Sequence, residues 1–115
     1  DVSGKVVVAG SSSVNPVMEK LIEAYNAVNP NGELGLQRND SSTGMHYAID
    51  GVCDIGMSTR ELKDSETSAG LSPTIIAMDG IAVIVNNNSS VENLSSDQVK
   101  SIFTGEVTLW SEITE

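Results

Sequence analysis

Several kinds of residue are scarce in this chain of 115 residues, and each scarcity excludes a class of protein. The single cysteine, Cys53, cannot form a disulfide within the chain, so no internal cross-link supports the fold. Lys and Arg number 6 against 16 Asp and Glu, which gives a net charge of -10. Nucleic acids and anionic membrane surfaces bind clustered positive charge. We therefore expect neither as a partner.

Long apolar runs and catalytic signatures are also absent. No run reaches the roughly 18 apolar residues of a membrane span, and no signal segment opens the sequence, as in a mature, processed chain. His46 and Cys53 are each alone in their type, which is too few for a zinc site. The sequence has no P-loop lysine, dinucleotide fingerprint or nucleophile elbow. We expect no cofactor, no metal and no enzymatic activity.

What is present is an alternation of apolar β-rich runs and helix-like segments. The runs are short and rich in Val and Ile, as in strands buried in a parallel sheet. The pattern predicts an α/β fold with a mainly parallel sheet flanked by helices. Helices are predicted at 15–29, 43–50 and 60–70, and strands at 5–9, 29–38, 53–58 and on both sides of Asp79-Gly80 within 73–86.

The sequence changes character at the polar, turn-rich segment 86–93, which reads as a linker. Ser95 and Gln98 then match a capping box at the start of a short helix. Only about 22 residues follow the linker, too few for a core of their own. We therefore divide the chain into a first lobe, 1–85, and a linker with the start of a second lobe, 86–115. The short helix carries an apolar stripe formed by Val99, Ile102 and Phe103.

Hydroxyl side chains gather where three of the predicted strands end. In open α/β sheets, ligands bind outside the carboxyl ends of the strands. A helix that starts there adds unpaired N–H groups and a positive dipole end, which suit an anion, and an arginine can fork onto an oxyanion. The sequence therefore predicts an oxyanion site at this edge. Its candidate residues are Ser12 and Ser13 in the first turn, Ser41 and Ser42 in the second, and Ser58 and Arg60 in the third.

Each of these clusters, taken singly, also fits an ordinary structural role. One serine can cap the following helix while the others fill a turn. Arg60 can form a surface ion pair with Glu61 or Asp64. The recurrence of the pattern at three strand ends favours binding over these alternatives.

Two longer stretches carry a family resemblance: "DIGMSTREL" at 54–62, and "DGIAVIVN" at 79–86 followed by "QVKSIFTGEVTLW" at 98–110. The chain closely resembles the phosphate-binding proteins of bacterial ABC phosphate importers, from about residue 4 to residue 113. The resemblance implies a two-lobed periplasmic-binding fold of type II that clamps inorganic phosphate in its cleft and delivers it to permease subunits. It also implies an extracytoplasmic location, in the periplasm or as a lipoprotein on the outer face of the membrane.

The resemblance assigns the phosphate contacts to the serines and Arg60 named above. A protonated phosphate also needs an acceptor, which distinguishes it from sulfate. Some family members carry an aspartate for this purpose in the strand-end loop, where this chain has Thr59. Asp79 is the predicted substitute, with Asp40 and Asp54 as weaker candidates.

The sequence also departs from the family pattern. Family chains are more than twice as long, so the lobe is expected to be incomplete, and the second hydroxyl-rich loop with its arginine is missing. Asp40 stands in a loop where the family commonly has glycines, and we expect it to weaken anion binding. We therefore expect this chain alone to bind phosphate weakly or not at all. Two alternatives stay open: a half-fold that forms homo-oligomers through the C-terminal stripe, and a site for another oxyanion such as sulfate or molybdate.

Overall fold

A computed structural model of the chain describes residues 3–113. The chain divides into two units, one up to Ile76 and one from Ala77. The predicted division into lobes after residue 85 stays a prediction. Among the described helices, none is both long and apolar enough to cross a membrane.

The first unit is built on a parallel sheet of three strands in the order β2-β1-β3, as the sequence predicts. Gly10 of the central strand lies opposite Arg38 on one side and Met57 on the other, so the three strands end level with one another. The turns that follow them therefore leave the sheet at the same edge. The strands are β1 (Gly4–Ser11), β2 (Gly32–Asn39) and β3 (Ile55–Met57).

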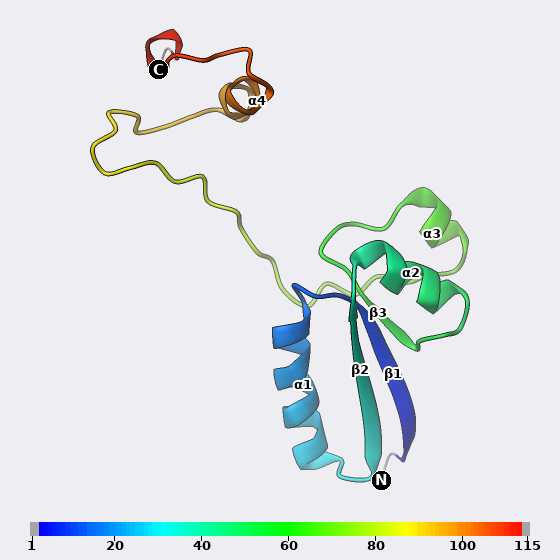
Figure 1. Ribbon diagram of the computed structural model, residues 1–115. Coiled ribbons are helices and arrows are strands. Elements are labelled where there is room, and N and C mark those ends of the chain that lie inside the picture. Colours follow the sequence, from blue (N-terminus) through cyan, green and yellow to red (C-terminus); the bar gives the residue numbers. More distant parts are fainter. Residues whose placement is uncertain (1–2, 114–115) are drawn as a thin grey trace. The chain divides into compact units, whose positions relative to one another are not determined.

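A helix follows each strand. The helix α1 (Asn15–Val28) packs beside β2, and α2 (Ser41–Ile49) packs on β1 and β3, as Figure 1 shows. The short helix α3 (Asp64–Ser68) follows the loop after β3. The α1 prediction is confirmed to within a residue, whereas α2 starts two residues earlier than predicted and α3 is shorter than the predicted 60–70.

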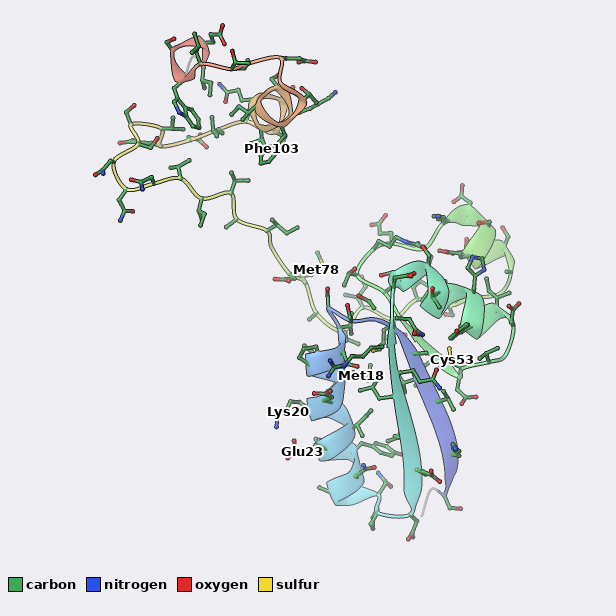
Figure 2. The ribbon with its side chains drawn as sticks, viewed as in Figure 1. Met18, Lys20, Glu23, Cys53, Met78 and Phe103 are labelled. Atoms are coloured by element: carbon green, nitrogen blue, oxygen red, sulfur yellow. The ribbon has the colours of Figure 1, made fainter. Side chains whose placement is uncertain are left out.

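The outer face of α1 is polar, as an amphipathic surface helix requires. Lys20 and Glu23 point away from the sheet and pair at 2.7 Å, whereas Met18 points toward the sheet (Figure 2). The one buried residue of α1 is polar: Asn15, at its first turn, is 1% exposed.

The core lies where the carboxyl half of β1 meets β3 and α2. Its buried apolar residues are Val8, Ala9, Met45, Cys53 and Met57. Two glycines allow α2 to lie directly on the strand backbone, because a Cβ added at Gly44 would stand only 2.7 Å from the Cα of Gly10. This close packing fixes the start of α2 at the ends of β1 and β3.

The second unit contains α4 (Ser96–Thr104) and a 3-10 turn (Trp110–Glu112), both expected from the sequence. The capping box is confirmed: the Ser95 hydroxyl accepts from the Gln98 N–H at 3.2 Å, and the Gln98 side chain accepts from the Ser95 N–H at 2.7 Å.

The two strands predicted within 73–86 are wrong, since residues 71–95 hold no regular helix or strand. A strand exists only when a neighbouring strand accepts its hydrogen bonds. In the described part of the chain no strand pairs with this segment, and Ile81 is 99% exposed.

Candidate anion site at the carboxyl edge of the sheet

The turn between β1 and α1 presents two free hydroxyl groups. The Ser12 N–H donates to the Asn39 carbonyl at 3.0 Å, which ties the turn to the end of β2. Ser12 and Ser13 are exposed, and their hydroxyls have no hydrogen-bond partner within residues 3–113. None of the serines caps α1, because the capping position is Val14 and Ser11 is the buried last residue of β1. Ser12 and Ser13 are therefore available as donors.

The turn between β2 and α2 presents a helix N-terminus. Asp40 caps this helix: one carboxylate oxygen accepts from the Thr43 N–H at 2.7 Å, and the other accepts from the Thr43 hydroxyl at 3.0 Å. Ser41 and Ser42 are the first two helical residues, and N–H groups at this position have no partner inside a helix. These N–H groups, with the positive dipole end, suit an oxyanion.

The loop after β3 is joined to the start of α2 by side-chain hydrogen bonds. The Ser41 hydroxyl accepts from the Thr59 N–H at 3.1 Å and lies 3.3 Å from the Thr59 hydroxyl. Arg60 donates to the Ser42 hydroxyl at 3.3 Å. The structure thus brings the second and third predicted clusters together.

Within this loop, the structure distinguishes two hydroxyl groups that the sequence presents side by side. The half-buried Ser58 hydroxyl is engaged by the Arg60 backbone, donating to its carbonyl at 2.8 Å and accepting from its N–H at 3.1 Å. Thr59 is exposed and faces Ser41. Thr59 is thus an additional candidate donor, which the sequence analysis did not select although it is adjacent to Ser58.

Arg60 is held by a carboxylate that the sequence analysis did not consider. Its guanidinium forms a two-pronged ion pair with Glu66, at 2.7 and 2.9 Å, and also donates to the Glu61 carbonyl at 2.9 Å. The structural alternative of an ion pair for Arg60 is thus realised, but with Glu66 in place of Glu61 or Asp64. Hydrogen bonds from Arg60 and from the Lys63 backbone lower the pKa of the nearly buried Glu66 to about 2, and the pair raises the pKa of Arg60. The positive charge of Arg60 is balanced inside the fold.

The predicted acceptor carboxylates lie in three different places. Asp79 belongs to the second unit, where it accepts from the Gly80 N–H at 2.8 Å, and its role at the site stays a prediction. Asp54 precedes β3 and accepts from the Val7 N–H at 2.8 Å, so it lies toward the opposite end of that strand. Asp40 is the candidate adjacent in sequence to the clustered serines.

The amide side chains of buried Asn15 and half-buried Asn39 flank the first turn. Asn15 donates to Glu19 at 2.7 Å, and Glu19 also accepts from Arg38 at 3.2 Å. The Asn15 side-chain oxygen and the Asn39 side-chain nitrogen are buried and have no partner among the described residues. Unsatisfied buried groups cost free energy, and they concentrate at functional sites. They make the base of the Ser12–Ser13 turn a candidate for such a site.

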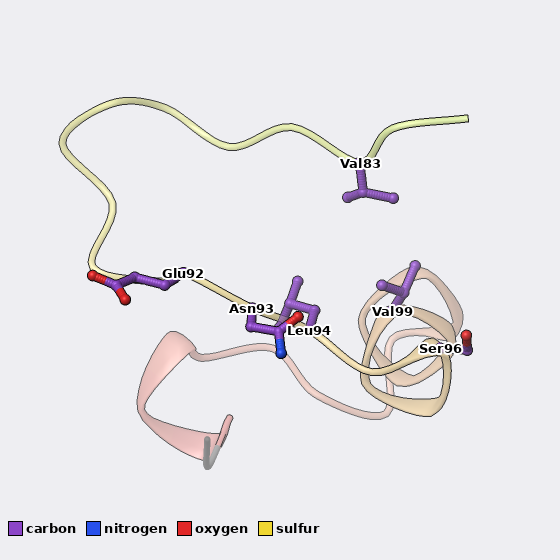
Figure 3. A pocket seen from close by; sticks show the side chains of 6 residues that line it. All are labelled: Val83, Glu92, Asn93, Leu94, Ser96 and Val99. Atoms are coloured by element: carbon purple, nitrogen blue, oxygen red, sulfur yellow. The ribbon is translucent and has the colours of Figure 1, made fainter. Parts of the chain in front are cut away.

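The second unit has a cavity of about 440 Å³, shown in Figure 3. Its wall combines apolar side chains with a carboxylate and contains no Lys or Arg, so it does not suit an anion. The lining residues are Val83, Glu92, Asn93, Leu94, Ser96 and Val99.

A parallel sheet with anion donors at its carboxyl edge defines a class of binding domain, and comparison with known proteins gives its family. The chain matches the family described as "PBP superfamily domain" over residues 1–114 and belongs to that superfamily.

Within this superfamily, the chain is similar to curated proteins named as phosphate-binding proteins. The chain is 57% identical over 113 residues to "Phosphate-binding protein PstS 2" of Streptococcus agalactiae, covering 98% of this chain and 39% of the relative. It is 41% identical over 111 residues to the protein of the same name from Streptococcus pneumoniae, covering 96% of this chain and 38% of that one. The chain thus spans about two fifths of the length of these relatives.

The solved structures that resemble this chain are of the same kind of protein. A phosphate-binding protein of a phosphate ABC transporter from Streptococcus pneumoniae superposes with a TM-score of 0.87 at 41% identity, over 98% of this chain and 44% of that chain. An ABC-type phosphate transport receptor from Vibrio cholerae gives 0.89 at 34% identity, over 95% and 44%. A structure from Clostridium perfringens that holds bound phosphate gives 0.78 at 41% identity, over 95% and 45%.

Proposed function

We propose that the chain binds inorganic phosphate, in the role of the solute-binding component of an ABC-type phosphate import system. One observation carries this proposal: two hydroxyl-bearing turns meet at one sheet edge, with the free hydroxyls of Ser12 and Ser13 in one turn and the N–H groups at the start of α2 in the other. The Ser12 N–H holds the first turn to Asn39, directly before the second turn. The names of the relatives and the bound phosphate in one similar structure support the choice of ligand.

The proposed roles follow the contacts. Ser12 and Ser13 donate through free hydroxyls, and Ser41 and Ser42 donate through the N–H groups at the start of α2, of which that of Ser42 also bonds to the Asp40 carboxylate. Thr59 adds a hydroxyl beside Ser41.

The other candidates act through the loop after β3 or from the second unit. Ser58 and Arg60 fix this loop and thereby position Thr59 and Ser42. Asp79 is proposed as the acceptor for the ligand's proton, contributed by the second unit.

Capture of this kind makes and breaks no covalent bond. Hydrogen bonds from neutral groups hold the ligand, and the permease subunits of an importer would receive it. A binding protein of an importer acts on the outer side of the membrane, so we place this chain there. Because the donor loop with an arginine, expected from the family, is not found in this sequence, binding by the chain alone is expected to be weak.

The test is a titration of the isotope-labelled chain with inorganic phosphate, followed by the backbone amide signals. We expect saturable shifts at Ser12, Ser13, Ser41 and Ser42, with a dissociation constant of about 1 mM. The double change Ser12→Ala and Ser41→Ala should weaken binding at least tenfold, whereas Ser68→Ala on α3 serves as the matched control. Shifts that do not saturate, or that lie elsewhere, contradict the proposal. Micromolar affinity would contradict the expectation of weak binding.

A second proposal concerns self-association, and the exposure of Phe103 favours it. This side chain of α4 is 82% exposed and belongs to the apolar stripe with Val99 and Ile102. Contiguous exposed apolar patches mark interaction surfaces. Sedimentation velocity at several concentrations should show concentration-dependent dimers, which Phe103→Ser reduces. A monomer at all concentrations excludes this second proposal and leaves phosphate binding untouched.

A further inference from the structure

The carboxylate of Asp40 is a fixed negative charge beside the proposed anion site. It immediately precedes Ser41, and both of its oxygens are held by Thr43, at 2.7 and 3.0 Å. This cap orients the carboxylate against the first turn of α2, the same turn that presents the N–H groups of Ser41 and Ser42. The Ser42 N–H also bonds to Asp40 and helps to lower the pKa of its carboxyl group. An anion bound there would lie close to Asp40.

The arginines near this edge are each paired with another carboxylate, and Arg60 offsets the charge of Asp40 only in part. Arg38 of β2 pairs with Glu19 of α1 at 3.2 Å, and Arg60 pairs with Glu66 of α3 at 2.7 Å. Each positive charge thus has its own carboxylate, which leaves Asp40 as surplus. The donors around the site are neutral N–H and O–H groups, so the local charge is negative.

A surplus negative charge acts more strongly on a doubly charged ligand than on a singly charged one, because Coulomb energy is proportional to ligand charge. We infer that Asp40 is a specificity-determining residue that makes the site favour singly charged tetrahedral oxyanions. Asp40 therefore shifts the selectivity of the site toward monoanionic phosphate and away from dianionic phosphate and sulfate. This inference rests on the proposed function and adds to it the charge form of the ligand.

The state of Asp40 itself does not change over the relevant pH range. Hydrogen bonds from the Thr43 backbone and hydroxyl hold the pKa of Asp40 below its ordinary value, and Arg60 acts in the same direction. Asp40 therefore stays charged while phosphate passes from monoanion to dianion. His46, the one histidine of the chain, lies in the last turn of α2, whereas Asp40 caps the start of that helix.

The experiment compares the chain with Asp40→Asn and Asp40→Ser. Both replacements are good helix caps, so α2 is retained while the charge is removed. Asp50→Asn makes the same charge change at the C-terminal end of α2 and is the matched control. Each chain is titrated with phosphate and with sulfate at about pH 5.5 and about pH 8.5, where phosphate is mainly singly and mainly doubly charged. Sulfate is doubly charged at both, so its pH dependence measures the contribution of the protein's own groups.

Both Asp40 variants should bind sulfate and alkaline phosphate roughly tenfold more tightly, and acidic phosphate only about threefold more tightly. Asp50→Asn should change every affinity by less than about twofold. Equal gains for singly and doubly charged ligands, or gains no larger than those of the control, overturn the inference and leave phosphate binding standing. If none of the chains binds phosphate at either pH, the proposed function and the inference both fall.

Discussion

The two units of this chain contain similar stretches of sequence and give them different structures. In the first unit a run of valines forms β1, where Val8 is 1% exposed and Ala9 is 0% exposed. In the second unit the run from Ile81 to Val85 is as rich in β-branched residues, but it forms no strand. Ile81 is 99% exposed and Ile84 is 86% exposed.

The difference lies in the neighbours of each run. The strand β1 is hydrogen-bonded to β2 on one side and to β3 on the other, and α2 covers its carboxyl half. Within the described residues, no strand pairs with the run in the second unit. High β-propensity measures how well a residue fits a paired, half-buried surface. Such a surface exists in the first unit, and for this reason the candidate anion site could be built there.

The difference in packing between the two units is tested most directly by substituting one glycine with alanine in each unit. Gly44→Ala places a Cβ 2.7 Å from the Cα of Gly10 and 3.0 Å from the Ala9 carbonyl, both backbone atoms that cannot move aside easily. We expect it to lower the free energy of unfolding by about 2–4 kcal/mol. The sign is informative, because Gly to Ala inside an unobstructed helix stabilises by up to about 1 kcal/mol. Urea denaturation followed by circular dichroism measures the change.

Gly80→Ala is the matched control in the second unit. A Cβ at Gly80 meets nothing within 4 Å, so we expect a change within about 0.5 kcal/mol. Equal losses from the two variants would show that the second unit is packed as tightly as the first. A stabilising Gly44→Ala would show that α2 does not rest on the strand backbone.

The units also differ in how well the sequence predicted them. The ends of α1 and α4 depend on signals within a few residues, such as Pro16 near the helix start and the Ser95–Gln98 box, and both helices were predicted well. The parallel sheet and its carboxyl edge followed from the alternation of elements. The strands predicted within 73–86 would need partner strands elsewhere in the chain, and the β-propensity of a segment does not show whether such partners exist.

The same limit applied inside the site. The topology was enough to predict that the serines of the two turns and the loop after β3 lie at one edge of the sheet. Three side-chain contacts could not be predicted in this way, because they depend on side-chain direction and on α3, which lies beyond the stretch 54–62. These are the contacts of Arg60 with Glu66, of Asp40 with Thr43 and of Thr59 with Ser41. Sequence spacing gives the edge on which residues lie, whereas the partner of each side chain depends on three-dimensional packing.

A smaller effect, set by pH, distinguishes the ion pair of the first unit from an exposed carboxylate of the second. Arg60 and the Lys63 backbone lower the pKa of Glu66 from 4.5 to about 2 in the folded chain. A carboxyl group with a depressed pKa stabilises the fold above its unfolded pKa and loses that contribution as pH falls toward its folded pKa. The stabilisation by Glu66 should therefore be complete at neutral pH and disappear between about pH 4.5 and pH 2.

Glu66→Gln isolates this contribution, because glutamine keeps the size and most of the hydrogen bonding but not the charge. Thermal unfolding of both chains should show a lower midpoint for Glu66→Gln at pH 7, and the two midpoints should converge as the solution is acidified through the interval given above. Glu106→Gln in the second unit, where the carboxylate is exposed, should follow the parent chain at every pH. A constant gap between Glu66→Gln and the parent would mean that the glutamate acts through packing alone. In that case its charge does not hold Arg60, and Arg60 would be free to contact the anion directly.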